Sequence, residues 1–361
     1  MTALAAPAQH APGGRTRPAW TAMAWITWRQ HRVALAGTGI LLGACAVLLA
    51  ISGLRLQAAH ANLVHGHCAI SGALITSPCG LLQTAYNNAG SLLLTGNVLT
   101  LTVAASVIPG LIGMFVGAPL LAREYETGTF RFAWTQAISR ARWAAAKLAL
   151  LAAMLTAAAG AFGALVSWFL AQDNPLSGGD RWQPSEFGLT AVTFAAWTLV
   201  AFAVGAFAGA LLKRTLPAMA VTAACVAAMA AVTYRKLDTP LLSFGPVIGR
   251  VTLLNQGIYQ PGSEPVTFLA GLAVVTSSPA GSWPLRSWAT GSRGLSVPSR
   301  VWNLKPSAQN AWLASHHISL WTAYQPPGRF WVFQSVEGGI GLLIALLLGA
   351  ATVWLVGRKT A

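Results

Sequence analysis

The sequence predicts an all-α integral membrane protein with six transmembrane helices and an extracellular subdomain between spans five and six. Composition is the first reason, because 55% of the 361 residues are hydrophobic and only 9% are charged. A soluble domain averages roughly 25% charged residues, so this chain has too few polar side chains to cover a water-facing surface. Patterning is the second reason, because six apolar runs are long enough to cross a bilayer core of about 30 Å, which takes about 20 helical residues.

The six apolar runs carry no Asp, Glu, Lys, Arg or His within their expected limits, so each can lie in lipid as a helix. They are residues 34–54, 98–121, 148–171, 188–211, 216–234 and 338–357. Proton- and ion-coupled transporters place carboxylates or histidines at depth in the membrane, so this pattern argues against that class. A further apolar run, 267–275, is too short to span and is expected to be a re-entrant or surface segment.

Basic residues set the expected orientation, since short cytoplasmic loops carry an excess of Lys and Arg. In this chain they gather in the N-terminal segment, in the loop after the second run, at Lys213 and Arg214, and at the C-terminus. We therefore expect a multi-pass plasma-membrane protein with both termini in the cytoplasm. Arg235 and Lys236 break the rule locally, but an even number of spans keeps the basic C-terminus inside. Because most basic residues lie at the ends of apolar runs, the net charge of +15 does not indicate nucleic-acid binding.

These expectations divide the chain into four regions. They are a cytoplasmic tail with an interfacial helix (1–33), a five-span domain with a cytoplasmic loop at 122–147 (34–234), an extracellular Trp/Pro-rich subdomain (235–337), and the sixth span with a cytoplasmic tail (338–361). Tryptophan prefers the headgroup level, so Trp20, Trp25 and Trp28 favour a helix that lies in the interface before the first span. A simple cytoplasmic anchor is the alternative for this segment.

Two of the four cysteines, Cys68 and Cys79, lie together in a polar loop on the expected outer side, where disulfides persist. Pairing them would close a small loop and stabilise the protein by about 3 kcal/mol in a chain-entropy model. A metal site is the alternative, because His65, His67 and Cys68 form the pattern H-x-H-C. The spacing is not that of a zinc site, so we expect the disulfide and no metal.

The stretch 117–147 is the most unusual of the chain, because it is charged and aromatic between two long apolar runs. Gly128 predicts a turn and Thr129 a helix cap. Apolar residues at helical spacing within 130–138 predict a short amphipathic helix parallel to the membrane. Ser139 is expected to cap the helix that follows.

An ordinary membrane anchor is one explanation for the basic and aromatic side chains of this stretch. Two features go beyond it. Glu124 and Glu126 place negative charge on a face where anionic lipids disfavour acid. The stretch also has helical periodicity where a short linker would suffice. The second explanation is therefore a surface that a partner outside the bilayer recognises.

The chain lacks the sequence patterns of several enzyme classes. It contains no G-x-x-x-x-G-K-[ST] phosphate-binding loop, no H-E-x-x-H and no G-x-S-x-G. We therefore expect no catalytic site and no cofactor in this chain. Any ATP-driven step would use ATP bound to a separate subunit.

Several stretches resemble the membrane permease subunits of type-2 ABC exporters, in an actinobacterial-like branch. Residues 117–147 resemble the pattern G-A-P-L-x-A-R-E-x-E-x-G-T-x-R-x-A-W-T-Q-x-x-S-R-x-R-W-x-x-x-K. Residues 28–32 resemble the W-R-Q-H-R before the first span of those proteins, and residues 213–220 resemble their R-R-T-L-P-A-M-A loop. Residues 324–337 resemble their Y-Q-P-x-x-R-F-W-x-F-Q-x-x-E stretch, whereas 240–320 match no pattern.

The resemblance implies six spans with cytoplasmic termini, a separate ATP-binding subunit and a dimer of permeases among membrane lipids. The loop at 122–147 would then couple closure of the ATP-binding subunits to the spans. The residues expected to contact the ATPase subunit are Arg123, Glu124, Glu126, Gly128, Thr129, Arg131, Trp134, Gln136 and Arg140.

Two functions follow from these observations. The first is a permease subunit of an ATP-driven exporter for an amphipathic small molecule or lipid, because apolar spans without buried charge suit such a cargo. The second is a non-transporting membrane protein whose extracellular domain binds a ligand or partner, in signalling or immunity. An ATP-binding protein that co-purifies with the chain would favour the first.

Overall fold

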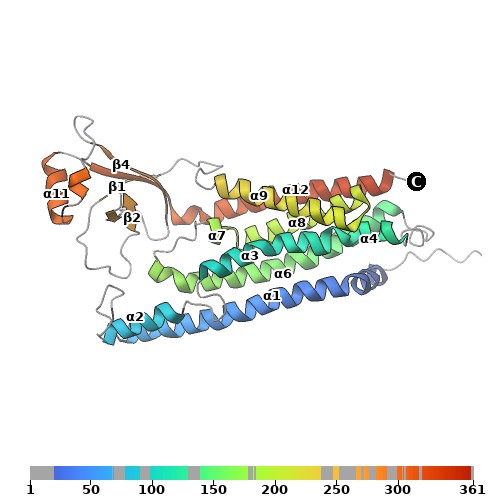
Figure 1. Cartoon of the computed structure of the whole chain (residues 1–361), viewed down its shortest axis with the longest axis horizontal. Coiled ribbons are helices and arrows are strands. Elements are labelled where there is room, and N and C mark those ends of the chain that lie inside the picture. Colours follow the sequence, from blue (N-terminus) through green and yellow to red (C-terminus); the bar gives the residue numbers. More distant parts are fainter. Residues whose placement is uncertain are drawn as a thin grey trace, which may run out of the picture.

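The structure is a computed structural model. It describes residues 20–66, 68, 78–89, 98–128, 139–177, 182, 184–236, 247–251, 266–269, 272–275, 282–290, 299–302, 304, 306–316 and 319–358. Long helices lie along one axis, and the strands gather beyond one end of them (Figure 1). The C-terminus lies at the opposite end of the bundle (Figure 1).

The bundle is built from helices that coincide with the six apolar runs of the sequence. They are α1 (Trp20–His65), α3 (Val98–Ile112) with η1 (Gly113–Gly117) and α4 (Pro119–Thr127), α6 (Arg140–Ser177), α8 (Ala191–Leu212), α9 (Thr215–Lys236) and α12 (Phe330–Arg358). Five of these stretches are long and apolar enough to cross a membrane within the described residues. The apolar part of α9 is shorter, Thr215–Ala231, so six spans remain a prediction.

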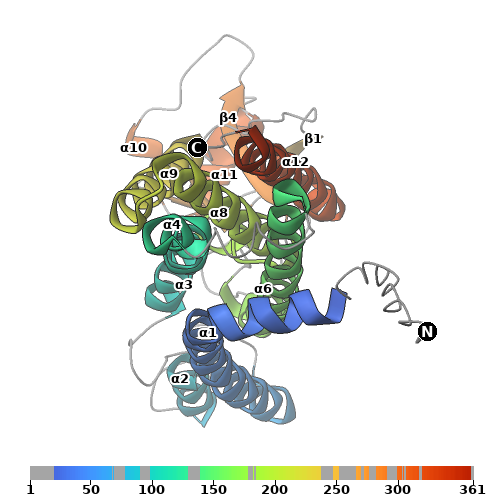
Figure 2. The same cartoon turned by 90° about the vertical axis from the view of Figure 1, so that its right-hand side faces the viewer.

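Helix α1 is much longer than the predicted span 34–54, since its 46 residues rise about 69 Å at 1.5 Å per residue. Its N-terminal part runs across the bundle axis before the helix turns along that axis (Figures 1 and 2). That geometry suits the predicted interfacial segment around Trp25 and Trp28, both of which are exposed. Helix α12 is also longer than predicted, because it begins at Phe330 instead of residue 338.

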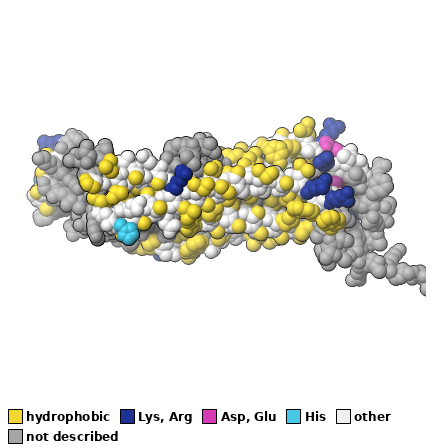
Figure 3. All heavy atoms as spheres, turned by 90° about the horizontal axis from the view of Figure 1, so that it is seen from below, with side chains coloured by type: hydrophobic (Ala, Val, Ile, Leu, Met, Phe, Trp, Pro, Cys, Tyr) yellow, Lys and Arg dark blue, Asp and Glu magenta, His cyan; other side chains and the backbone are white. Residues whose placement is uncertain are grey.

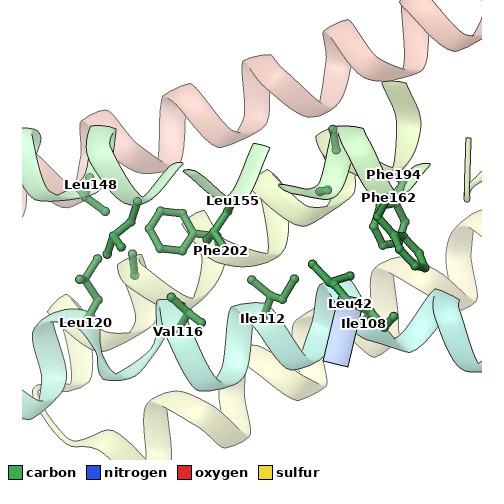
Figure 4. Close-up of a cluster of buried hydrophobic side chains, with 14 of the residues drawn as sticks. Leu42, Ile108, Ile112, Val116, Leu120, Leu148, Leu155, Phe162, Phe194 and Phe202 are labelled. Atoms are coloured by element: carbon green, nitrogen blue, oxygen red, sulfur yellow. The ribbon is translucent and has the colours of Figure 1, made fainter. Parts of the chain in front are cut away.

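The hydrophobic core lies where α3, η1, α6 and α8 meet. Ile108, Ile112, Val116 and Leu120 follow one another at four-residue spacing and share one face of the second span. They point toward side chains of α6 and α8 (Figure 4). α8 lies at the centre of the bundle and packs against α12, α6, η1, α9, α3 and α4.

The second span contains a π-helical segment, η1, between Pro109 and Pro119. The backbone N–H of Ala118 donates to the carbonyl oxygen of Gly113 at 2.9 Å, five residues earlier. Such wide turns interrupt α-helices mainly at functional positions. The span thus combines two features that interrupt regular α-helix, the prolines and the π segment between them.

Glycines let η1 approach α8 closely, because small residues allow helix backbones to come together. A Cβ on Gly113 would lie 2.5 Å from the carbonyl oxygen of Ala201, and one on Gly117 would lie 2.6 Å from that of Phe202. Real side chains cannot approach backbone that closely. The two spans are therefore in direct backbone contact at η1.

A disulfide joins Cys68 to Cys79, with the two Cα atoms 5.4 Å apart. This is the pairing that the sequence favours. The bridge connects the end of α1 to α2 (Pro78–Ala89), and Leu56, Leu63 and Tyr86 are buried between the two helices. His67, part of the alternative metal pattern, lies outside the described residues.

The segment between α9 and α12 contains β-structure that the all-α prediction did not include. One sheet has the order β1 (Val247–Val251), β5 (Ser319–Gln325), β4 (Trp283–Thr290), and all its pairs are antiparallel. In a separate two-stranded sheet, β2 (Val266–Leu269) pairs antiparallel with β3 (Leu272–Val275). The described part of the run 267–275, expected to be a re-entrant or surface segment, thus lies in two paired strands. Short helices α10 (Ser299–Trp302) and α11 (Pro306–Ser315) complete the described part.

Candidate functional site

Charged side chains gather at the end of the bundle that carries the C-terminus, next to a predominantly hydrophobic band (Figure 3). We call this region the charged end. It comprises residues 25–32, 119–128, 139–147, 212–215 and 354–358. Those basic residues used to predict the cytoplasmic side that the structure describes lie here, so this end is the predicted cytoplasmic face.

Helix α4 is the central element of the charged end. Pro119 occupies its first turn, where its missing N–H is not needed. Gly128 ends it in the left-handed conformation with φ 69°, which a residue without a Cβ adopts at no steric cost. The turn expected at Gly128 is therefore present. Its charged residues, Arg123, Glu124 and Glu126, lie on a short, well-bounded helix and not on a loop.

Glu124 forms an ion pair with Lys147 of α6, and the side chains are 14% and 3% exposed. The same ammonium donates at 2.9 Å to the side-chain oxygen of Gln30 on α1. It also lies 5.1 Å from the ring centroid of Trp143. A buried charge needs such partners, because desolvation would otherwise make it very costly. This arrangement, which we call the inner node (Gln30, Glu124, Lys147), joins α1, α4 and α6.

Glu126 connects α4 to α9. Its carboxylate accepts the backbone N–H of Thr215 at 2.9 Å and the Thr215 hydroxyl at 2.5 Å. A carboxylate at a helix N-terminus satisfies a free N–H and interacts favourably with the helix dipole. The turn before α9 is held further by Lys213, which has φ 55° and lies with its ammonium 5.7 Å from the Tyr125 ring.

Helix α4 is therefore attached on two sides. Glu124 connects it to α6 and α1, and Glu126 connects it to α9. Through η1 it is continuous with the second span. Helix α4 is thus linked by side chains to α1, α6 and α9 and by the backbone to α3.

Of the residues predicted to contact an ATPase subunit, Arg123 and Glu126 are exposed at the charged end, and Gly128 and Arg140 are partly exposed there. Glu124 differs, because its carboxylate is directed into the inner node and pairs within the chain. Ser139 caps α6, since its hydroxyl accepts the N–H of Arg142 at 3.4 Å. Four further candidates, Thr129, Arg131, Trp134 and Gln136, lie outside the described residues, as does the predicted amphipathic helix at 130–138.

A second polar cluster, which sequence reasoning missed, lies between α8 and the first turns of α12. Buried Gln334 accepts hydrogen bonds from the Thr193 hydroxyl and from the Thr193 N–H at 3.3 Å. Its amide donates to the carbonyl oxygen of Phe187 at 3.0 Å. One turn further, the carboxylate of Glu337 accepts the indole N–H of Trp197 at 2.9 Å. We call these four side chains, Thr193, Trp197, Gln334 and Glu337, the outer node.

The outer node places an ionisable residue, Glu337, directly beside the predicted sixth span and on the same helix. The predicted sixth span began at residue 338, one position after Glu337, because the window of apolar residues ends there. In the structure α12 starts at Phe330, so Glu337 lies two turns inside a helix that is apolar enough to cross a membrane. The sequence signal that could have revealed the outer node is the stretch 324–337, because its resemblance pattern includes both Gln334 and Glu337.

Aromatic side chains connect the outer node to the sheet. Trp182 stacks on Trp283 of β4 at 5.5 Å between ring centroids and meets Phe330 and Phe333 of α12 edge-on. Buried Gln325 of β5 accepts a hydrogen bond from Arg329 at 2.8 Å, just before α12. The sheet is thus fixed to the start of α12 by packing on one side and a hydrogen bond on the other.

Comparison with known proteins gives one match. The model of a family described as "ABC-2 membrane transporter related" matches residues 39–237, which include the described part of the second span, α4, α6, α8 and α9. No curated protein and no solved structure matches the chain.

Proposed function

The chain belongs to the ABC-2 membrane transporter related family, and we propose that it is the permease subunit of an ATP-driven exporter. The family match covers residues 39–237, more than half of the chain. At the level of the family, the chain is a multi-pass membrane transport component. Export, hydrolysis of ATP by a separate subunit, a dimer of permeases and an amphipathic cargo are the further parts of the proposal.

The attachment of α4 on two sides is the observation that supports this proposal most. An ATPase outside the bilayer must move several spans at once, and rigid connected elements transmit such motion better than flexible loops. Helix α4 is joined to α6 and α1 by the inner node and to α9 by Glu126. Its exposed residues, among them Arg123 and Glu126, face away from the bundle end and are available to a partner.

The structure divides the predicted contact set into two roles. We propose that Arg123, Glu126, Gly128 and Arg140, with Thr129, Arg131, Trp134 and Gln136, contact the ATPase subunit. We assign Glu124 to the inner node, where it holds α4 in position for that contact. We propose that α4 tilts relative to α3 at the π-helical segment η1, which separates the two helices.

Charge reversal at Glu126 tests the proposal. The permease and the product of a neighbouring ATPase gene would be co-expressed, purified in detergent and assayed for complex formation and ATP hydrolysis. Glu126→Lys is expected to weaken the complex or to remove the effect of the permease on hydrolysis. Arg300→Glu, an exposed charge reversal on α10 at the far end of the molecule, serves as the matched control.

The result that contradicts the proposal is equally concrete. If Glu126→Lys assembles and stimulates hydrolysis as the unmodified permease does, α4 is not the coupling element. If no ATP-binding protein forms a complex with the unmodified chain, the alternative of a non-transporting membrane protein with a ligand-binding outer domain is favoured.

A further inference from the structure

We propose that Glu337 and Trp197 form a binding site for the ammonium group of a cationic amphipathic molecule. The proposal rests on the permease function, since it assigns a chemical class to the cargo. Its starting point is the position of one carboxylate. Ionisable side chains within membrane-spanning helices are costly, and they generally mark a ligand or ion site.

Glu337 lies on the face of α12 that packs against α8. On the same helix, Gln334 contacts α8, and Gly338 and Gly341 lie so close that a Cβ would meet Val192 at 2.6 Å and Ala196 at 3.0 Å. Residues three or four apart share a helix face, so Glu337 lies along the same contact. Its hydrogen bond with Trp197 of α8, at 2.9 Å, confirms that orientation.

No cation compensates this carboxylate within the part of the chain that the structure describes. The salt bridge found there joins Glu124 to Lys147 at the opposite end. Helix α8 has no Lys or Arg, and α6 has none after Lys147. The basic residue that precedes Glu337 most closely in the sequence, Arg329, lies before α12, eight residues away, and donates to Gln325.

The indole of Trp197 satisfies only part of what a carboxylate can accept. One oxygen of Glu337 receives the indole N–H, whereas an ionised carboxylate has about four acceptor positions. Glu337 and Trp197 are both partly exposed, so a molecule from outside can reach them. The ring face of a tryptophan also attracts cations.

The surroundings favour an organic cation over a metal ion. A hard metal cation needs several oxygen ligands, and the described residues contain no cluster of three or more metal-binding side chains. Phe333 lies one turn before Glu337 on the same helix and is partly exposed. An amphipathic ammonium can place its charge on the carboxylate and its apolar part along such side chains.

A pair of dansyl probes that differ only in charge tests the site. Dansylcadaverine carries a terminal ammonium, and N-pentyl dansylamide lacks it. Both would be titrated against the full-length protein in lipid nanodiscs and followed by dansyl fluorescence. The unmodified protein should bind the cationic probe at least about tenfold more tightly, the effect of one charge-assisted hydrogen bond.

Variants assign that preference to the site. Glu337→Gln should abolish the preference and leave the affinity for the neutral probe unchanged, and Glu337→Asp should keep part of it. Asp173→Asn, near the C-terminal end of α6, removes a carboxylate that neither proposal uses; it is the matched control and should keep all of the preference. Equal binding of the two probes by the unmodified protein, or a preference that survives Glu337→Gln, would overturn the proposal.

Two further measurements keep the test decisive. If Glu337→Gln does not fold, labelling of Glu337 by dicyclohexylcarbodiimide in the unmodified protein replaces it. Dansylcadaverine should slow that labelling and the neutral probe should not; equal protection by both would contradict the site.

Arg181, outside the described residues, is the nearest basic residue in sequence to Trp182. A preference that appears only in Arg181→Gln would mean an internal ion pair and would also refute the site.

The outcome does not depend on the ATPase partner. Complex formation and ATP hydrolysis are measured in separate samples, and probe binding is measured on the permease alone. Cation binding without an ATPase partner would refute the permease proposal and leave the site. An ATPase partner that binds the chain, together with no preference for the cationic probe, would refute only the site.

Discussion

The two partly buried glutamates of the bundle, Glu124 and Glu337, are in opposite electrostatic situations. Glu124, at the charged end, forms an ion pair with Lys147. The Lys147 ammonium also contacts Gln30 and the ring of Trp143. Glu337, in the outer node, has an indole N–H as its partner and no cation among the described residues. The comparison teaches that a carboxylate of the first kind holds helices together, whereas one of the second kind is available to a ligand.

The largest expected effect comes from breaking the inner node. Lys147→Met would leave the Glu124 carboxylate buried without a counter-charge, which typically costs about 3–5 kcal/mol. We expect a large fall in the thermal unfolding temperature of the purified protein. The double variant Lys147→Met with Glu124→Leu should recover most of the loss, because no unpaired charge remains. A single variant as stable as the unmodified protein would show that the pair is not structural.

The outer node should respond differently to the loss of its polar groups. Gln334→Leu removes the acceptor of the buried Thr193 hydroxyl and N–H, at a cost of about 1–3 kcal/mol. Glu337→Gln should change the unfolding temperature much less, because the glutamine oxygen can still accept the Trp197 N–H and an uncompensated charge is removed. If Glu337→Gln destabilised the protein as strongly as Lys147→Met, the contrast between the two nodes would be false.

The contact between η1 and α8, which lies between the two nodes, predicts opposite signs for two glycine substitutions. Gly113→Ala should destabilise by about 1–3 kcal/mol, since the new methyl group would meet the backbone of Ala201. Gly349→Ala on α12 has nothing within 4 Å of its new Cβ and should stabilise the helix by about 0.5–1 kcal/mol. Thermal unfolding of the two variants beside the unmodified protein measures both.

The smallest effect on stability is expected at the exposed side of α4. Glu126→Ala removes the contact with Thr215 but leaves no buried group unsatisfied. We expect an unfolding temperature close to that of the unmodified protein together with an altered effect on ATP hydrolysis. A large fall in stability would mean that Glu126 acts mainly by holding α9, and only indirectly on a partner.

Much of the helical bundle could be predicted from the sequence, because hydropathy reports directly on lipid exposure. The predicted starts and ends of the helices were less accurate than their order along the chain. The sixth span was placed from 338, because Gln334 and Glu337 lower the hydropathy of the turns before it. Those two side chains face α8, and their partners Thr193 and Trp197 lie about 140 residues earlier. A local window contains no information on such a contact.

The candidate site was predicted in part for the same reason. Position next to the second span indicated that Glu124 and Glu126 differ from ordinary anchors. Nothing in the sequence distinguished the two glutamates, because this segment was expected to be a loop. Residues two apart, such as Glu124 and Glu126, point in different directions on a helix, and the structure shows that α4 is one. The structure directs Glu124 to Lys147 and Glu126 to Thr215. The strands β1, β4 and β5 were missed because these short stretches lack a clean alternating pattern of apolar and polar residues.

The most direct test of the account is a double-mutant cycle between Glu126 and Thr215, read as the effect of the permease on ATP hydrolysis by its reconstituted partner. The account predicts that Glu126→Ala and Thr215→Val each reduce the effect and that the double variant is no worse than either one, since both remove the same link between α4 and α9. Full additivity of the two losses, or no loss in either variant, would contradict the central claim that α4 transmits motion through this contact.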